Sequence, residues 1–423
     1  MRRMIHVAPQ AAIAPSPVWR ILVLARAVGV ILMIGLVILV AARSPARAGG
    51  AEFRAFIEQL WPQARARGVT RATFDAAFDG VTLNPAVLKL TKSQAEFVKP
   101  IWDYLGSAVS SDRVGKGREK AQAWEDSLSR AEKLYGVDRY IVLGVWGMET
   151  NFGGFVGDNY VVRALATLAY ARYRGDYFRE ELLSALEILE QGHVSPRGMI
   201  GSWAGAMGQT QFMPSSFKKY AVDFDGRGRK DIWTSVPDAV GSTANYLAQH
   251  GWIKGETWGY EVMLPKGFSL AKHDQSTDHA FSAWAADGVT RADGEAMPGS
   301  GEASLLLPAG AHGPAFLVTP NFKVIKSYNN STSYALGVAL LGDRIAGWPA
   351  LRAAWPRGER PLNVRQTREV QSRLARMGFA VGDLDGKLGD KAREAIRAYQ
   401  ARAGLEPDGY ASLKLLETMR VAR

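Results

Sequence analysis

A single carboxylate ends an apolar run in the middle of the chain. Between Tyr140 and Glu149 the only carboxylate is Glu149, and most residues before it are Ile, Leu, Val, Trp or Met. So continuous an apolar run predicts a buried helix with an acid near its C-terminal end. Burial disfavours the charged carboxylate and raises its pKa, which keeps it protonated as a general acid requires. The competing interpretation is an ordinary glutamate at a helix end that faces water.

A glycine-rich stretch from Trp203 to Phe217, WAGAMGQTQFMPSSF, carries neutral polar groups. Its glycines allow the backbone to approach a ligand or a neighbouring element closely. The amides of Gln209 and Gln211 suit the recognition of hydroxyl and amide groups. The competing interpretation, which the stretch favours when taken alone, is a glycine-rich turn with Met and Phe in the core.

An acidic loop from Asp223 to Trp233, DFDGRGRKDIW, partly matches a calcium-binding loop. Asp223 and Asp225 stand at positions one and three of an EF-hand, and a glycine stands at position six. Position five is Arg227 and position twelve is Thr234, where oxygen ligands are expected. A cation at position five opposes a metal ion, so a turn stabilised by Asp–Arg contacts is the competing interpretation.

The N-terminal residues 1–48 are predicted to lie outside the fold. They combine a basic start with a nearly continuous apolar run, Val28–Ala42, and end in small residues that predict secretory cleavage after Ala48. An uncleaved membrane anchor is the alternative, because Ile21–Ala42 approaches spanning length if Arg26 is tolerated. The chain contains no cysteine, which excludes disulfides and a lipid-modified cysteine.

The net charge gives no sign of nucleic-acid binding. The formal charge of +11 includes six arginines in the first 48 residues, which leaves only +5 for the remainder. Nucleic-acid binding would need a basic patch across the main domain. A composition of 47% hydrophobic and 22% charged residues is typical of a globular protein.

The pattern predicts two folded parts joined by a linker. Residues 50–346 are mainly helical, with a small β insertion whose period-two pattern runs from Gly259 to Lys326. Within it, Pro320-Asn321 predicts a hairpin turn before a strand over Phe322–Tyr328. Residues 347–361 are rich in Trp, Pro and Arg and form the linker, and residues 362–421 form a small helical binding module.

Local signals also predict where several helices begin and end. Asp138 is a plausible N-cap of the helix that carries Glu149, and Gly115–Gly117 predicts an exposed break between helices. Tyr328-Asn329-Asn330-Ser331 precedes a helix that Ser331 or Ser333 caps. Asn329 is therefore either a cap residue or an amide that faces a ligand, and the local sequence leaves both open.

Together these motifs resemble a known family. GVWGMETNFG (144–153), GAMGQTQFMPSSF (205–217), DFDGRGRKDIW (223–233) and YNNSTSYA (328–335) resemble, in order and spacing, the membrane-bound lytic murein transglycosylases of the B type. Residues 362–421 resemble a three-helix peptidoglycan-binding domain. The resemblance implies a mainly α (α+β) fold, with a lysozyme-like catalytic domain, a small β insertion and a three-helix C-terminal module.

The resemblance also implies roles for particular residues. Glu149 falls on the family's single catalytic acid/base. The residues that fall on polar positions of the substrate cleft are Gln211, Ser216, Tyr328 and Asn329. Asp223, Asp225 and Asp238 fall on the calcium loop, with Arg227 in place of an expected acid. No cofactor is required, and calcium would be structural.

The implied reaction needs one carboxyl group. Glu149 protonates the glycosidic oxygen between N-acetylmuramic acid and N-acetylglucosamine, and then deprotonates the muramic acid C6 hydroxyl, which closes a 1,6-anhydro ring. Gln211 and Asn329 would orient the substrate, and Ser216 would hold Glu149. We expect a periplasmic monomer that acts on glycan strands, binds no nucleic acid and touches a membrane only through an uncleaved N-terminus. The alternatives are a lysozyme-type hydrolase and a non-catalytic peptidoglycan-binding protein.

Overall fold

A computed structural model describes residues 45–92, 99–270, 277–358 and 362–421. The chain divides into two compact units, residues 1–59 and 60–423, with the division inside α2 (Pro45–Ala66). Most of the predicted leader lies outside the described residues, and α2 includes its last four, 45–48. None of the helices in the described ranges has the length and apolar character to cross a bilayer.

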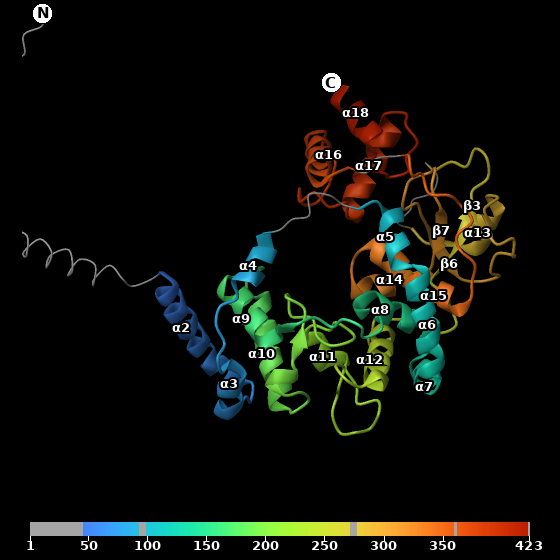
Figure 1. Ribbon diagram of the computed structural model, residues 1–423. Helices are drawn as coiled ribbons and strands as arrows, with labels where there is room; N and C mark the ends of the chain where they lie inside the picture. Colours follow the sequence, from blue (N-terminus) through green and yellow to red (C-terminus); the bar gives the residue numbers. More distant parts are fainter. Residues whose placement is uncertain (1–44, 93–98, 271–276, 359–361, 422–423) are drawn as a thin grey trace, which may run out of the picture. The chain divides into compact units, whose positions relative to one another are not determined.

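Two glycine-bearing helices pack together at the centre of the larger unit. They are α8 (Arg139–Thr150) and α15 (Thr332–Ala346) (Figure 1). A Cβ on Gly144 would lie 2.3 Å from the carbonyl oxygen of Val338, and one on Gly342 would lie 2.7 Å from that of Tyr140. These glycines therefore let the two backbones approach more closely than any side chain would permit.

Further helices surround this pair. α9 (Val161–Tyr170) packs on α10 (Tyr177–Glu190), α7 (Glu125–Tyr135) packs on α12 (Val236–Gln249), and both α5 (Ile101–Ala108) and α6 (Ser111–Ala123) pack on α15. The remaining helices of this part are α3 (Arg71–Phe78), α4 (Pro85–Lys92), α11 (Pro214–Tyr220), α13 (Phe281–Ala286), α14 (Pro320–Tyr328) and the 3₁₀ turn Pro196–Gly198.

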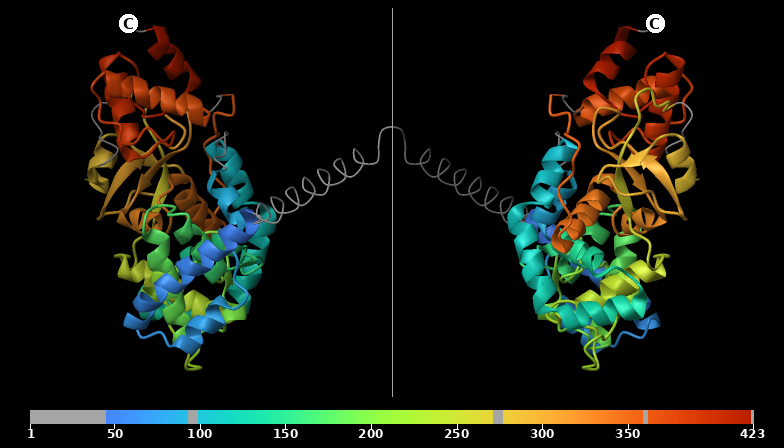
Figure 2. Two further views of the ribbon diagram at one scale, coloured as in Figure 1. Left: turned by 90° about the vertical axis from the view of Figure 1, so that its left-hand side faces the viewer. Right: turned by 90° about the vertical axis from the view of Figure 1, so that its right-hand side faces the viewer.

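The predicted β insertion is present as an antiparallel sheet of order β4-β6-β7-β3-β5. Figure 2 shows the strands of this sheet as yellow to orange arrows. Phe281 and Trp284 of α13 share a buried cluster with Val262, Leu305 and Leu317 of the three central strands. The strands are β3 (Gly259–Met263), β4 (His279–Ala280), β5 (Thr290–Arg291), β6 (Glu302–Leu306) and β7 (Ala315–Val318), and a separate pair joins β1 (Asn159–Tyr160) to β2 (Ile200–Gly201).

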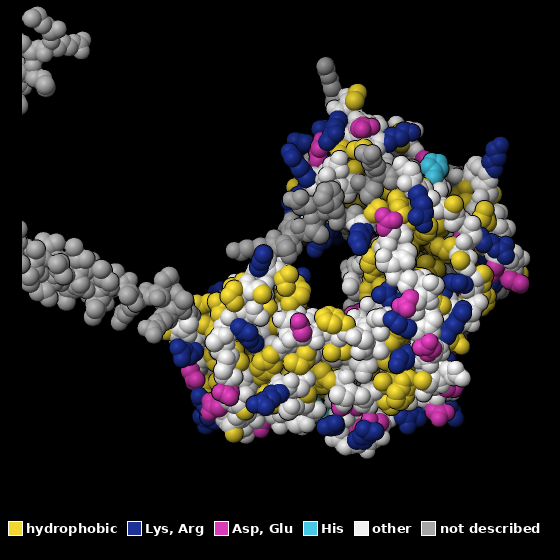
Figure 3. Space-filling view, in the orientation of Figure 1, with side chains coloured by type: hydrophobic (Ala, Val, Ile, Leu, Met, Phe, Trp, Pro, Cys, Tyr) yellow, Lys and Arg dark blue, Asp and Glu magenta, His cyan; other side chains and the backbone are white. Residues whose placement is uncertain are grey.

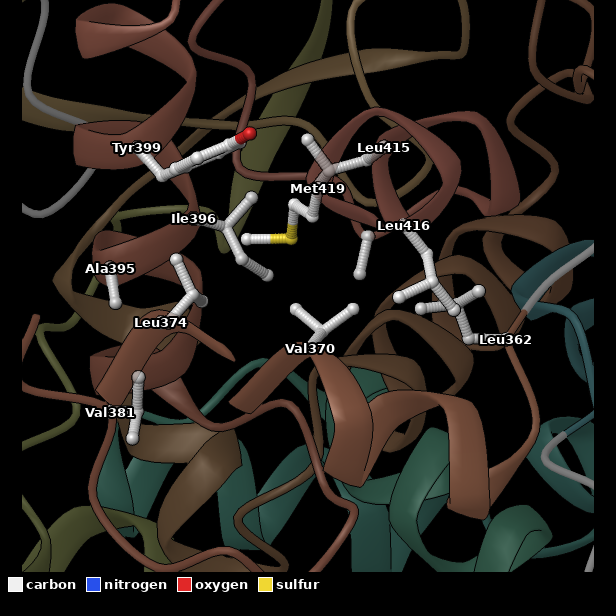
Figure 4. Close-up of a cluster of buried hydrophobic side chains, with 11 residues drawn as sticks. Leu362, Val370, Leu374, Val381, Ala395, Ile396, Tyr399, Leu415, Leu416 and Met419 are labelled. Atoms are coloured by element: carbon white, nitrogen blue, oxygen red, sulfur yellow. The ribbon is translucent and has the colours of Figure 1, made fainter. Parts of the chain in front are cut away.

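The C-terminal residues form a three-helix unit with a core of its own. Helices α16 (Val364–Arg376), α17 (Asp390–Arg402) and α18 (Leu413–Val421) direct apolar side chains into one cluster (Figure 4). Two glutamines, one on α16 and one on α17, make the same kind of hydrogen bond to the loop that follows their helix. The amide of Gln371 bonds the turn at Gly386, and the amide of Gln400 bonds the turn at Gly409. Each helix thus fixes the Asp-Gly loop that follows it.

Two local predictions are wrong. Gly115–Gly117 does not break a helix but lies inside α6, where a Cβ on Gly117 would meet Ile345 at 2.4 Å. Gly117 therefore serves packing, whereas Gly115 is exposed and nothing lies within 4 Å of the position of its Cβ. Residues Pro320–Tyr328 form α14 and not a turn followed by a strand. Proline at the first helical position has the φ of a helix and needs no N–H partner, so it starts this helix.

Candidate active site

The central helix α8 delivers Glu149 to its last turn. The carboxylate of Asp138 caps the other end by accepting from Tyr140 N at 2.7 Å, as predicted. Asn151 ends the helix in the left-handed conformation. Burial raises the pKa of Glu149 from 4.5 to about 7, against the opposing effect of a hydrogen bond from Tyr334. Near neutral pH this group can therefore both donate and accept a proton.

Tyr334 is the residue that holds Glu149. Its hydroxyl donates to Glu149 Oε1 at 2.5 Å from the first turn of α15. We predicted this role for Ser216, which forms no hydrogen bond with Glu149 in the described part of the chain. Ser216 lies partly buried in α11. The sequence does contain Tyr334, within the YNNSTSYA motif, but as one apolar position of a helix it gives no functional signal.

Three tyrosines surround the carboxyl group. Burial, and next the negative charge of Glu149, raise the pKa of Tyr104, Tyr328 and Tyr334. By contrast, no second carboxylate in the described ranges contributes to the pKa of Glu149. The acid therefore lies among hydroxyl groups and is not half of a carboxylate pair.

The glycine-rich loop is fixed directly to α8. Trp146 Nε1 donates to Gln209 Oε1 at 3.0 Å, and Thr150 Oγ1 donates to the carbonyl of Gln209 at 3.0 Å. A Cβ on Gly208 would lie 2.6 Å from the carbonyl of Ile232. Gln209 is therefore a structural residue that anchors the loop, and the loop's position relative to Glu149 is fixed through it.

Gln211 has a backbone in the left-handed region and a side-chain amide whose N–H groups are both hydrogen-bonded within the protein. Its φ is +52°, and its Nε2 donates to the carbonyls of Val156 (3.1 Å) and Gly208 (2.9 Å). These two bonds use both N–H groups. The carbonyl oxygen of the amide is therefore the atom that can accept a hydrogen bond from a ligand.

Tyr328 and Asn329 lie at the end of α14. Tyr328 Oη donates to the carbonyl of Thr210 at 2.7 Å, and its ring contacts those of Phe212 and Tyr246. Tyr328 thus joins α14 to the glycine-rich loop. Asn329 is the exposed C-cap residue of α14, and its carbonyl accepts from Ser331 N. Ser331 caps α15, as predicted.

The acidic loop brings its carboxylates together. Asp223, Asp225 and Asp238 offer oxygens within 4.8 Å of one another. Backbone N–H groups of the loop already donate to Asp238, and the guanidinium of Arg227 lies 3.4 Å from Asp225. Calcium takes six to eight oxygen ligands. The donors present therefore fit part of a calcium site, with an ion pair that competes for one of them.

The surface carries charges of both signs. On the face drawn in Figure 3, Lys and Arg side chains lie among Asp and Glu side chains and do not gather into a basic patch.

Comparison with known proteins decides the family. Residues 52–343 match the model of the transglycosylase SLT domain, and residues 364–419 match that of a putative peptidoglycan binding domain. The chain belongs to the SLT transglycosylase family. It is a lytic murein transglycosylase, an enzyme that acts on peptidoglycan and needs no cofactor for its chemistry. The predicted fold class, mainly α and lysozyme-like with a helical C-terminal module, is confirmed.

Three relatives illustrate the similarity. Membrane-bound lytic murein transglycosylase B of Escherichia coli is 39% identical over 278 residues, which cover 62% of this chain and 74% of the relative. SltB3 from Pseudomonas aeruginosa, in complex with NAG-anhNAM-pentapeptide, is 44% identical with a TM-score of 0.84, and the match covers 87% of this chain and 99% of SltB3. Escherichia coli Slt35 in complex with calcium is 34% identical with a TM-score of 0.59, over 71% of this chain and 94% of Slt35.

Proposed function

We propose that Glu149 is the single acid/base of this lytic transglycosylase. The observation that carries the proposal is a buried carboxyl group with a pKa of about 7 among hydroxyl groups. Protonated Glu149 gives its proton to the oxygen that leaves C1 of N-acetylmuramic acid. The substrate's acetamido group relieves the positive charge that develops at C1. Ionised Glu149 then takes the proton of the C6 hydroxyl, whose oxygen bonds to C1, so no water is consumed.

Tyr334 is a positioning residue in this scheme. Its hydroxyl donates a hydrogen bond to Glu149 Oε1. The other carboxyl oxygen, Oε2, then carries the proton and faces the substrate. The same hydrogen bond stabilises the ionised carboxylate that forms after the first proton transfer. Tyr334 therefore acts in both halves of the reaction without touching the sugar.

Four polar residues are proposed to bind the substrate. The amide oxygen of Gln211 accepts from a sugar hydroxyl or acetamido N–H, and the exposed amide of Asn329 provides both a donor and an acceptor. Ser216 contributes a hydroxyl from α11. The hydroxyl of Tyr328 is committed to Thr210, so its ring is the part that meets the ligand.

The remaining assignments concern location and partners. We propose that the enzyme is exported to the periplasm, acts there as a monomer on glycan strands, and contacts a membrane only through an uncleaved N-terminus. Residues 362–421 would bind peptidoglycan as a separate module. These assignments are supported by the leader-like sequence of residues 1–48, the match to a peptidoglycan binding domain, and the membrane-bound relative.

We also propose that Asp223, Asp225 and Asp238 hold a structural calcium ion. Their converging oxygens and the calcium complex of Slt35 support this assignment. The ion would tie the loop to α12 and take no part in proton transfer. Calcium should raise the melting temperature above its value in EDTA, and Asp238→Asn should remove that difference. Equal melting temperatures for the unchanged protein would contradict a calcium site.

Mass spectrometry of released muropeptides tests the reaction. The purified protein should release products with 1,6-anhydro ends from peptidoglycan, and Glu149→Gln should release none while it still binds the polymer. Products one water heavier would instead identify a lysozyme-type hydrolase and a missed second carboxylate. No release by the unchanged protein would identify a non-catalytic binding protein.

A further inference from the structure

A cavity of about 240 Å³ lies at the opposite end of α8 from Glu149. Asp138 lines it, and Glu149 follows Asp138 by eleven positions along the helix, which corresponds to roughly 16 Å at 1.5 Å per residue. Its lining also includes Asp343 near the C-terminal end of α15, Trp348 from the loop after α15, and Trp252, Thr257 and Trp258 from the segment before β3. The cavity is thus separate from the catalytic carboxyl group.

Two carboxylates face this cavity without a fixed cation. Both oxygens of Asp343 accept from the same donor, Trp258 Nε1, at 3.2 and 3.1 Å. An ionised carboxylate offers about four acceptor positions, so one N–H leaves most of them unused. Within the described ranges, neither Asp138 nor Asp343 forms an ion pair. Burial, and to a lesser degree the charge of Asp138, raise the pKa of Asp343 to about 7, against the hydrogen bond from Trp258.

Indole rings supply the other walls. Trp258 is buried and contacts the rings of Phe316 and Phe322, which hold it rigidly. Trp252 is also buried, whereas Trp348 is 56% exposed on the loop that follows α15. The backbone N–H of Trp348 donates to the backbone carbonyl of Asp343 at 2.9 Å, so the backbone that carries this side chain is fixed. The cavity therefore has a rigid floor and one exposed aromatic residue in its lining.

The chemistry of this lining favours a cation over a sugar. Aromatic faces attract a cation through the ring quadrupole, and a carboxylate supplies the opposite charge. Among the residues that the structure describes, no Lys, Arg, Asn or Gln lines the cavity. Sugar hydroxyls can donate to carboxylates, but a sugar ring stacks on an open aromatic face, and of the three indoles only Trp348 is exposed. Alkylammonium groups bring the donors and the positive charge that this cavity lacks.

We propose that this cavity binds a primary ammonium group on an alkyl chain, of the kind that a diamino acid in a peptide stem carries. The assignment to a substrate peptide rests on the proposed function, whereas the affinity for an amine does not. Bound there, the ammonium group lies between Asp138 and Asp343 while its methylene groups contact the indoles. The site would let the enzyme distinguish strands whose peptides carry a free amine from strands whose peptides do not.

Titration calorimetry with 1,5-diaminopentane on the full-length protein tests the proposal. We expect saturable binding that Asp343→Asn and Trp348→Ala each weaken about tenfold, which is the size of one charge contact or one cation–π contact in a partly desolvated site. Asp112→Asn is the matched control, because Asp112 is an exposed carboxylate on α6. It should bind the diamine as the unchanged protein does, and 1,5-pentanediol should not bind.

A second variant and a second ligand keep the outcome decisive. Asp138→Asn retains an N-cap side chain for α8, so it tests the charge even if Asp343→Asn fails to fold. Glu149→Gln should still bind the diamine, which separates this site from failure of the catalytic assignment. Binding of N-acetylglucosamine in place of the diamine would overturn the proposal, as would no binding of either ligand. Undiminished diamine binding by the Asp138 and Asp343 variants would also overturn it.

Discussion

Removing one hydroxyl group should change the pH dependence of catalysis. Tyr334→Phe keeps the buried ring in α15 and deletes only the donor that lies 2.5 Å from Glu149 Oε1. This donor favours the ionised carboxylate and so lowers the pKa of Glu149 against the effect of burial. Without it, the pKa of Glu149 must rise above its value of about 7.

The size of the shift follows from the strength of the bond. A hydrogen bond to a charged group contributes about 1.5–3 kcal/mol, and one pKa unit corresponds to about 1.36 kcal/mol. The pKa of Glu149 should therefore rise by about one to two units in Tyr334→Phe. The weaker acid and the less constrained carboxyl group should also lower kcat about tenfold at pH 7.

The assay is kcat/KM on a soluble glycan fragment, measured from pH 5 to pH 10. The basic limb of the profile, where free Glu149 loses its proton, should move to higher pH by the same one to two units. Tyr104→Phe is the matched control, because Tyr104 senses the charge of Glu149 and no hydrogen bond joins the two. An unmoved basic limb in Tyr334→Phe, or equal shifts in both variants, would refute this account of Glu149.

Three other predictions test the site, the core and the module. The folded-state pKa of Glu149 exceeds its unfolded value of 4.5, so its contribution to stability is complete below pH 4.5 and is lost as the pH rises through about 7. Chemical denaturation should therefore show Glu149→Gln more stable than the unchanged protein by about 1–3 kcal/mol at pH 8 and equal to it at pH 4; no gain at pH 8 would contradict the raised pKa. Gly144→Ala should lower the free energy of unfolding by about 2–3 kcal/mol, because its Cβ would lie 2.3 Å from a carbonyl of α15, whereas Gly115→Ala, whose Cβ meets nothing, should not. Deleting residues 362–423 should weaken binding to intact sacculi more than it slows cleavage of soluble fragments, and equal losses would contradict a separate binding module.

Features with short-range causes were predictable from the sequence. The apolar run before Glu149 predicted a buried helix, and Asp138 and Ser331 cap α8 and α15 as their types and positions suggest. The small β insertion is also present within the predicted range Gly259–Lys326, although β6 and β7 are buried along consecutive residues and do not alternate. Each of these depends on residues that lie within one or two turns of each other, so local patterns contain the information.

Features that depend on distant contacts were not predictable. Tyr334 is 185 residues from Glu149, and only the packing of α15 on α8 brings its hydroxyl to the carboxylate. Gly117 reads as a helix breaker, but its lack of a side chain makes room for Ile345, which belongs to another helix. The error at Pro320 is different. A proline is compatible with a turn and with a helix start, and only the residues that pack on Phe322 and Ile325 select the helix.

The two ends of α8 show why similar buried acids need not do similar work. Burial raises the pKa of Asp138 at one end and of Glu149 at the other. At Glu149 the neighbours are hydroxyl groups, which accommodate both the protonated and the ionised form, as a residue that transfers a proton in each direction requires. At the other end the negative charge of Asp138 acts on a second carboxylate, Asp343, and penalises its ionisation instead of easing it. A bound cation removes that penalty, so the hydroxyl groups around Glu149 suit proton transfer, whereas the two carboxylates at the other end suit the binding of an amine.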